Sequence, residues 1–396
     1  MNPVILKVGL ISFFADLSSE LLYPITPLFI TGVLHASMTS LGMIEGCAEL
    51  TASLIKGWAG KKSDQVGSRR KFVWGGYLIS TLSKASIGLA GSWVGVLVAR
   101  SLDRVGKGVR TAPRDALIAE SVPKEQLGFA FGVHRGMDTL GAVLGPLFTI
   151  YLLGIYGQES LRGFYFYALI PGLLAVILAT RLPETVKAGA KAAMNLAGDL
   201  SRSLQGNGAT TSNGRLAQLP RSYFVFMLGW GIFSFANSSD AFLILKTQNH
   251  ETSLTRTVFM YCLFNLVYAV SSPFLGKIAD RFGKLFVLKV SLVVFAGVYV
   301  GFGLGLNPWI LFPVYGLFMG MSEGVGKALV ADFVPEGRQK DLGATAQGFF
   351  GLVTGISALG ASLIAGLLWD QFGESAPFFY GGGGALLSLI VFLILR

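Results

Sequence analysis

The segment Gly60-Lys-Lys-Ser-Asp64-Gln-Val-Gly67 has a near copy, Gly276-Lys-Ile-Ala-Asp280-Arg-Phe-Gly283, in the second half of the chain. Each copy lies at the end of one apolar run and shortly before the next. The two aspartates are 216 residues apart in a chain of 396 residues. A motif that recurs at this distance predicts an internal repeat.

Three further landmarks recur at nearly the same spacing. The matched segments are Val122-Pro123 with Val334-Pro335, Leu127-Gly128 with Leu342-Gly343, and Ser18-Ser19-Glu20 with Ser238-Ser239-Asp240, offset by 212, 215 and 220 residues. We therefore expect two similar halves of six helices each, related as a parallel repeat. In such proteins the binding site lies between the halves, near the bilayer midplane.

The composition is that of a membrane protein. Hydrophobic residues make up 52% of the chain, charged residues only 14%, and the mean hydropathy is +0.60. A soluble protein carries about 25% charged residues. A span needs about 20 mostly apolar residues. We expect an all-α membrane protein with twelve transmembrane helices, at 8–34, 39–60, 72–90, 92–121, 127–155, 162–181, 220–247, 253–276, 284–306, 307–334, 341–370 and 376–395.

The expected domains are an N-terminal six-helix bundle at 1–181, a cytoplasmic linker at 182–219 and a C-terminal six-helix bundle at 220–396. The linker is polar and rich in Gly, which is typical of connecting segments. Its first part, 186–204, has the pattern of a short amphipathic helix on the membrane surface.

Basic residues predict the orientation. The loops after the second, sixth, eighth and tenth expected helices carry Lys and Arg, whereas the alternate loops at 35–39, 91–92 and 306–308 carry none. By the positive-inside rule both termini are cytoplasmic, in the cell inner membrane. Lys246 and Arg256 are exceptions. The net charge of +10 therefore indicates topology rather than nucleic-acid binding.

The repeated segment, followed by two arginines, resembles the loop 2–3 signature of the major facilitator superfamily (MFS). The resemblance implies a secondary transporter of the MFS fold in the drug-efflux-like branch, with no cofactor and no enzymatic activity. In the family this signature latches the cytoplasmic side in the outward-open state. Gln65 stands where the family usually has Arg, so this latch lacks one charge. The gate residues it implies are Gly60, Asp64, Gly67, Arg69, Arg70, Gly276, Asp280, Arg281 and Gly283.

The fourth expected helix carries an unusual row of charges. Arg100 matches the family's helix-4 arginine, which is implicated in proton coupling, and Arg104 replaces a usual Gly. At about 100° per residue, seven charges of this helix fall within about 140° of arc. Two interpretations remain open: a cationic wall for an anionic substrate, or a buried ion-pair lattice with acids of helices 1, 2 and 5. The expected cavity residues are Arg100, Asp103, Arg104, Lys107, Asp138 and Glu45.

The fifth expected helix contains Gly136, Gly141, Gly145 and Pro146. The pattern resembles the GxxxGP motif of facilitator antiporters, although Thr149-Ile150 replaces the family's second glycine pair. Small residues four apart also allow close helix packing, so an exporter signature and a plain packing helix both remain open.

Several carboxyl groups lie within the expected spans. A carboxyl group removed from water has a raised pKa and can load and release a proton near physiological pH. The expected proton carriers are first Glu20 and Asp240, the repeat-related pair, then Asp16 and Glu49, with Arg100 in a coupling role.

The leading hypothesis is a proton-coupled exporter of a small organic molecule, acting as a monomer in the bilayer. It depends on the fifth helix and the intramembrane acids. The alternative is uptake or exchange of an anionic metabolite, a carboxylate or a phosphate ester, by means of the charges on the fourth helix.

Overall fold

The computed structural model describes residues 2–66, 68–123, 126–183, 216–251, 253–335 and 339–395. These residues are almost entirely helical and contain no strand. The first half consists of α1 (Pro3–Leu22), α2 (Thr26–Leu28), the π-helix η1 (Phe29–Val33), α3 (Met38–Val66), α4 (Arg69–Leu89), α5 (Trp93–Glu120), α6 (Leu127–Tyr156), η3 (Gln158–Ser160), α7 (Leu161–Tyr167) and α8 (Leu169–Thr180). The second consists of α11 (Arg221–Ala236), α12 (Ala241–His250), α13 (Leu254–Phe282), α14 (Lys284–Gly303), α15 (Pro308–Asp332), α16 (Gln339–Phe372) and α17 (Ala376–Ile394).

Over the described residues these elements form the twelve helical rods that the apolar runs predict. Three rods are interrupted: α1 to η1, η3 to α8, and α11 to α12. The first is broken after Tyr23, where Pro24 cannot donate a backbone hydrogen bond. The rod at α11 is broken over 237–240, so Asp240 lies directly before α12 instead of inside a continuous helix.

By length and apolar composition, six helical stretches among the described residues are suited to cross a membrane. They are Phe129–Tyr156, Gln158–Thr180, Leu254–Phe282, Lys284–Gly303, Thr345–Phe372 and Ala376–Ile394. The charged helix α5 is not among them. Charges within a membrane bundle face its interior or a wet cavity, so α5 belongs at the centre of the molecule.

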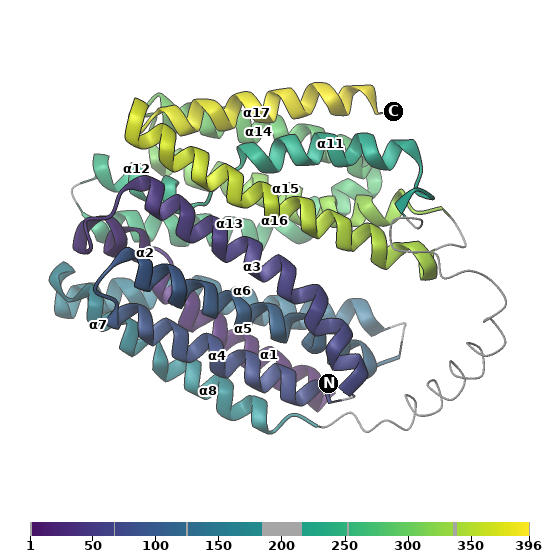
Figure 1. Ribbon diagram of the computed structural model, residues 1–396, viewed down its shortest axis with the longest axis horizontal. Helices are drawn as coiled ribbons and strands as arrows, with labels where there is room; N and C mark the ends of the chain where they lie inside the picture. The colour runs from purple at the N-terminus through teal and green to yellow at the C-terminus, as the bar shows by residue number, and fades with distance from the viewer. Residues whose placement is uncertain are drawn as a thin grey trace.

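The two halves lie face to face, with the purple-to-blue helices on one side and the teal-to-yellow helices on the other (Figure 1). Both chain ends lie at the same end of the bundle, here called the termini end; the opposite end is the far end. α3 packs along α16, and α6 packs on α13. At Gly42 of α3 an added Cβ would lie 2.0 Å from the carbonyl oxygen of Ser362, so only glycine allows these backbones to meet.

A clasp holds the halves together at the far end. Asp370, at the end of α16, accepts hydrogen bonds from the backbone N–H groups of Met38 and Thr39 at 3.1 and 2.8 Å. It also accepts one from the Thr39 hydroxyl at 2.6 Å. The carboxylate thereby caps the start of α3, which belongs to the other half. The far end of the seam is closed by this contact.

The expected linker at 182–219 falls mostly outside the described residues, as does the whole expected surface helix at 186–204. The described helices on either side of it end at Thr180 and begin at Arg221.

Candidate functional site

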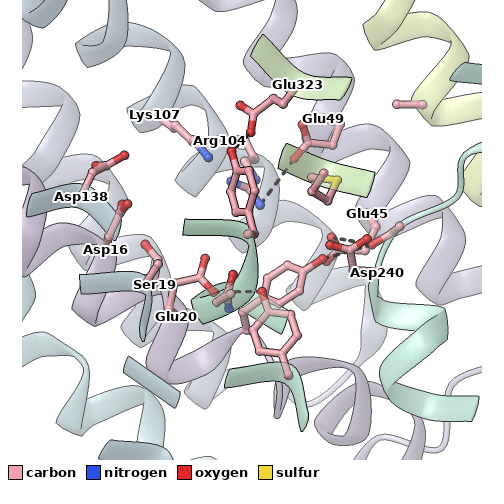
Figure 2. A pocket seen from close by; sticks show the side chains of 18 of the residues that line it. Asp16, Ser19, Glu20, Glu45, Glu49, Arg104, Lys107, Asp138, Asp240 and Glu323 are labelled. Atoms are coloured by element: carbon pink, nitrogen blue, oxygen red, sulfur yellow. Dashed lines mark hydrogen bonds and ion pairs between the residues drawn. The ribbon is translucent and has the colours of Figure 1, made fainter. Parts of the chain in front are cut away.

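A cavity of about 470 Å³ lies between the two halves. Figure 2 shows its side chains converging from helices of both halves. Eight acidic and five basic side chains line it, so acids are in excess: Asp16, Glu20, Glu45, Glu49, Asp103, Asp138, Asp240 and Glu323 against Arg100, Arg104, Lys107, Arg110 and Arg135.

The part of the cavity nearest the far end is an ion-pair network. The Arg100 guanidinium pairs with Glu45 at 3.2 Å and with Asp103 at 3.8 Å, and all three side chains are buried. Ser239, from the second half, donates a hydrogen bond to Glu45 at 3.4 Å. Arg100 is therefore neutralised by its neighbours, as the ion-pair interpretation expects.

Lys84 of α4 lies behind this network, and it is not among the residues expected from the sequence. Its side chain is buried, and its ammonium group donates to the Ser18 hydroxyl at 3.3 Å. Ser80, one helical turn earlier, donates to Asp103. The sequence did carry a signal for this residue, namely a lysine in the middle of an apolar span. A charged residue there is energetically costly and faces the interior of the bundle.

Nearer the termini end, Arg104 pairs with Glu49 at 3.5 Å. The Glu49 side chain is 50% exposed, whereas that of Glu45, one turn earlier on α3, is 4% exposed. The Glu49 side chain is therefore exposed in the cavity, whereas that of Glu45 is packed among its neighbours.

Glu20 and Asp240, the repeat-related acids, face the same cavity (Figure 2). Tyr261 donates a hydrogen bond to Glu20 at 3.0 Å, and Tyr315 donates one to Asp240 at 2.7 Å. Among the described residues neither carboxyl group forms an ion pair with Lys, Arg or His. Their partners are neutral hydroxyl groups, which the sequence could not identify.

Asp16 and Asp138 project into the same part of the cavity (Figure 2). Asp138 lies 3.8 Å from Arg135 of its own helix, while Asp16 has no ion pair within the described residues. The acids of α1 thus form no ion pair with the arginines of α5, whereas the acids of α3, Glu45 and Glu49, do.

The glycines of α6 hold α1 in place. A Cβ at Gly141 would lie 2.4 Å from the Phe13 carbonyl oxygen, and one at Gly145 would lie 2.7 Å from the Leu21 nitrogen. These glycines seat the helix turns that carry Asp16 and Glu20. Pro146 follows within the same helix, and Gly136 faces open space.

Arg135 joins the halves nearer the termini end. Its guanidinium pairs with Glu323 at 3.2 Å and donates to the Tyr268 hydroxyl, both in the second half. The preceding His134 is buried, and its Nε2 hydrogen-bonds the Ser12 hydroxyl at 2.8 Å. His134 is therefore bonded within its own half.

The expected gate segments each engage their own half. Arg69 pairs with Glu120 at the end of α5 at 3.0 Å, and Lys284 pairs with Asp332 at the end of α15 at 2.8 Å. These two contacts are related by the repeat.

The other gate residues are placed as follows. Arg70 donates to the Leu182 carbonyl at 3.5 Å, and Arg281 lies over the Phe282 ring at 5.5 Å. Gly283 has φ +97°, a conformation that favours glycine. Gly60 lies against Ala112, Gly276 faces open space and Asp280 is exposed. Gly67 and the side chain of Asp64 fall outside the described residues.

Two six-helix halves around a charged cavity define a polytopic secondary transporter. The chain belongs to the Major Facilitator Superfamily, whose family model matches residues 8–341 and 221–396. It is a multi-pass membrane transporter and not an enzyme.

Known proteins agree with this assignment. An uncharacterized MFS-type transporter of Methanocaldococcus jannaschii is 34% identical, over 98% of this chain and 94% of that protein. The multidrug resistance protein MdtG of Serratia proteamaculans is 37% identical over 156 residues, 38% of this chain and 36% of that protein. Among solved structures, a point mutant of the nucleoside transporter NupG superposes with a TM-score of 0.77 at 12% identity, covering 99% of both chains.

Proposed function

We propose that this protein is a proton-coupled exporter of a small organic solute. The observation that carries the proposal is the pair Glu20 and Asp240, two acids in the cavity wall that are bonded to tyrosine hydroxyls and not to cations. The partial relationship to a multidrug resistance protein supports export.

An ionised carboxyl group without a cation is costly inside a membrane protein. The cost is removed when the group takes up a proton or when a positively charged group binds beside it. A proton and a cationic substrate therefore compete for the same acids. Competition of this kind makes transport an exchange, because each ligand leaves when the other binds.

The hydrogen bond from Tyr261 to Glu20 connects this competition to the seam between the halves. Tyr261 lies on α13, Glu20 lies on α1, and the bond is 3.0 Å long. A hydrogen bond to an ionised carboxylate is roughly twice as strong as one between neutral groups. An empty, ionised Glu20 would thus hold the seam closed at the far end. Neutralisation by a proton or a substrate would release it.

We place the termini end in the cytoplasm, because the Lys- and Arg-rich loops lie on that side. We also propose that this state opens toward the cytoplasm, because the clasp at Asp370 joins the halves at the opposite end. Opening would then separate Arg135 from Glu323. We further propose the cell inner membrane as the location, and a monomer as the working unit. Gly60 to Arg70 and Gly276 to Gly283 would form the cytoplasmic gate when the halves close there.

A test that does not require the substrate to be identified beforehand uses everted membrane vesicles. Respiration acidifies the vesicle interior, and a ΔpH-sensitive acridine dye reports the gradient. Candidate solutes from a drug and metabolite library are then added. We expect a substrate to dissipate the gradient in vesicles with the wild-type protein but not with Glu20→Gln/Asp240→Asn. A solute that accumulates without any proton movement would refute the proposal.

One observation favours the alternative function, uptake or exchange of an anionic metabolite. Lys107 and Arg110 line the cavity and form no ion pair among the described residues. The same vesicles distinguish the two functions. An anion that is carried together with protons would dissipate the gradient only when it is loaded inside the vesicles, because it would then leave the acidic interior together with protons. Arg100 and Arg104, to which the cationic-wall interpretation assigns the anion, are already paired with Glu45 and Glu49.

A further inference from the structure

The cavity holds unpaired charges of both signs. Glu20 and Asp240 lack a basic partner, and Lys107 and Arg110 lack an acidic one, among the described residues. We call the first pair the acidic pole and the second pair the basic pole. Unpaired opposite charges would pair if they could reach each other, so their separation is itself informative.

Arg110 is the decisive residue of the basic pole. Its side chain is only 4% exposed, yet its Nε and Nη1 atoms have no hydrogen-bond partner in the described structure. The face of the guanidinium rests on the Tyr77 ring at 4.3 Å. A guanidinium held by its face and unsatisfied at its polar edge is arranged to receive acceptor oxygens.

Lys107, one turn earlier on α5, is exposed in the cavity and forms no ion pair in the described structure. The buried Nε of Arg104 and Nδ2 of Asn265 are also unsatisfied donors at the cavity wall. The donors thus come from both halves. They point to a ligand that carries oxygen acceptors.

The poles lie at different levels of the cavity. Asp240 follows Ser239, which contacts Glu45, the partner of Arg100. Asp240 therefore lies near the level of Arg100. Along α5, Lys107 is about 10 Å and Arg110 about 15 Å further toward the termini end. Asp240 and the basic pole are thus separated along the cavity, and a bound molecule can contact both.

We infer that the solute is zwitterionic, with its cationic group at Glu20 and Asp240 and its anionic group at Lys107 and Arg110. The inference rests on the proposed function and adds the class of substrate. A simple cation would leave the basic pole unpaired, and a simple anion would leave the acidic pole unpaired. A zwitterion satisfies both, and its amino group still competes with protons.

The test compares three probes of equal chain length, ε-aminocaproate, caproate and hexylamine. Their binding to the purified full-length protein is measured as thermal stabilisation at constant ionic strength, since a ligand that binds the folded state raises apparent stability. We expect ε-aminocaproate to bind more tightly than either single-charge probe. The shorter γ-aminobutyrate should bind more weakly, because it spans less of the gap.

Variants assign each pole. Arg110→Gln should weaken ε-aminocaproate at least about tenfold and leave hexylamine unchanged, because truncating one partner of a buried charge pair is costly. Glu20→Gln/Asp240→Asn should weaken hexylamine and leave caproate unchanged. Lys7→Gln removes a positive charge at an exposed side chain outside the cavity and should change nothing. If Arg110→Gln does not fold, Lys107→Gln takes its place in this test, because the Lys107 side chain is exposed.

Glycerophosphoethanolamine, the soluble form of a zwitterionic lipid headgroup, is a further probe. If it binds better than ε-aminocaproate, and binds less well to Arg110→Gln, the zwitterion is a lipid headgroup and not a free solute. The inference is overturned if ε-aminocaproate and glycerophosphoethanolamine bind no better than hexylamine, or if Arg110→Gln has no effect. These binding results do not depend on proton movement, so the vesicle assay can fail or succeed independently.

Discussion

Tyr261 of α13 donates a hydrogen bond of 3.0 Å to the carboxylate of Glu20 on α1. The same tyrosine stacks on Tyr23 at 5.4 Å between ring centroids, also across the seam. One side chain thus joins a candidate proton carrier to the closed end of the cavity. The link suggests how a change of charge at Glu20 moves the two halves.

The first prediction concerns this bond. Tyr261→Phe keeps the ring and removes the donor, and a hydrogen bond to a charged group contributes about 1.5–3 kcal/mol. We expect the far end to open more often. Labelling by a maleimide at Ala241→Cys, a position 1% exposed at the start of α12, should become at least about tenfold faster. The background protein has both native cysteines, Cys47 and Cys262, replaced by Ala.

The control for this experiment is Tyr165→Phe. Tyr165 is also a buried tyrosine, but its hydroxyl donates to Thr26 within the same half, at 3.0 Å. The labelling rate should stay at the wild-type value. Equal rates for Tyr261→Phe and Tyr165→Phe would show that the Glu20 bond does not hold the seam.

The second prediction concerns the packing of α6 on α1. Gly141→Ala places a methyl group 2.4 Å from the Phe13 carbonyl oxygen, so the helices must separate. Overpacking of this kind costs about 1–3 kcal/mol, and we expect a lower Tm in detergent and lower expression. Gly136→Ala, in the same helix and facing open space, should instead raise the Tm slightly, because alanine is the better helix former. Equal Tm values for the two variants would contradict the account.

The positions of the helices were largely predictable from the apolar runs and the polar loops between them, although only six of the described helical stretches have by themselves the length and apolar composition of a span. The charged face of α5 was also predictable from its periodicity. The tyrosine partners of Glu20 and Asp240 were not, because they come from distant segments that only the packed bundle brings together.

The sequence left two roles open for the arginines of α5. Arg100 and Arg104 line the cavity, and acids of α3 at matching heights neutralise them, as the ion-pair interpretation expects. Arg110, further along the same helix, lies on Tyr77 without an acid. Which basic residue of a helical row finds a partner depends on the register of the neighbouring helix, and one sequence does not reveal it.

The third prediction concerns Glu374, in the loop between α16 and α17 outside the spans. It pairs with the buried Lys246 at 2.7 Å and accepts a hydrogen bond from Asn249 at 2.8 Å. Burial alone would raise the pKa of Glu374, but hydrogen bonds from Lys246 and Asn249 lower that pKa to about 2. We expect Glu374→Gln to lower the free energy of unfolding by on the order of 2 kcal/mol at neutral pH.

The pH dependence follows from the sign of this shift. A carboxyl group with a lowered pKa in the folded state stabilises the fold above its unfolded pKa, about 4.3, and loses that effect as the pH falls toward 2. The Tm difference between wild type and Glu374→Gln should be roughly halved on going from pH 5 to pH 3. Glu251→Gln, at a weaker pair with Arg256 at 3.8 Å, should have little effect at any pH. A Tm difference unchanged at pH 3 would refute the assignment.

The most direct test of the central claim, that Glu20 and Asp240 exchange a proton for substrate, measures protons. A solute that the vesicle assay identifies is added to purified protein in weakly buffered solution with a pH indicator. The account predicts net proton release on binding by the wild type and by Glu323→Gln, whose acid is ion-paired in the same cavity. It predicts no release by Glu20→Gln/Asp240→Asn. Undiminished release by that double variant, or binding to the wild type without release, would contradict the account.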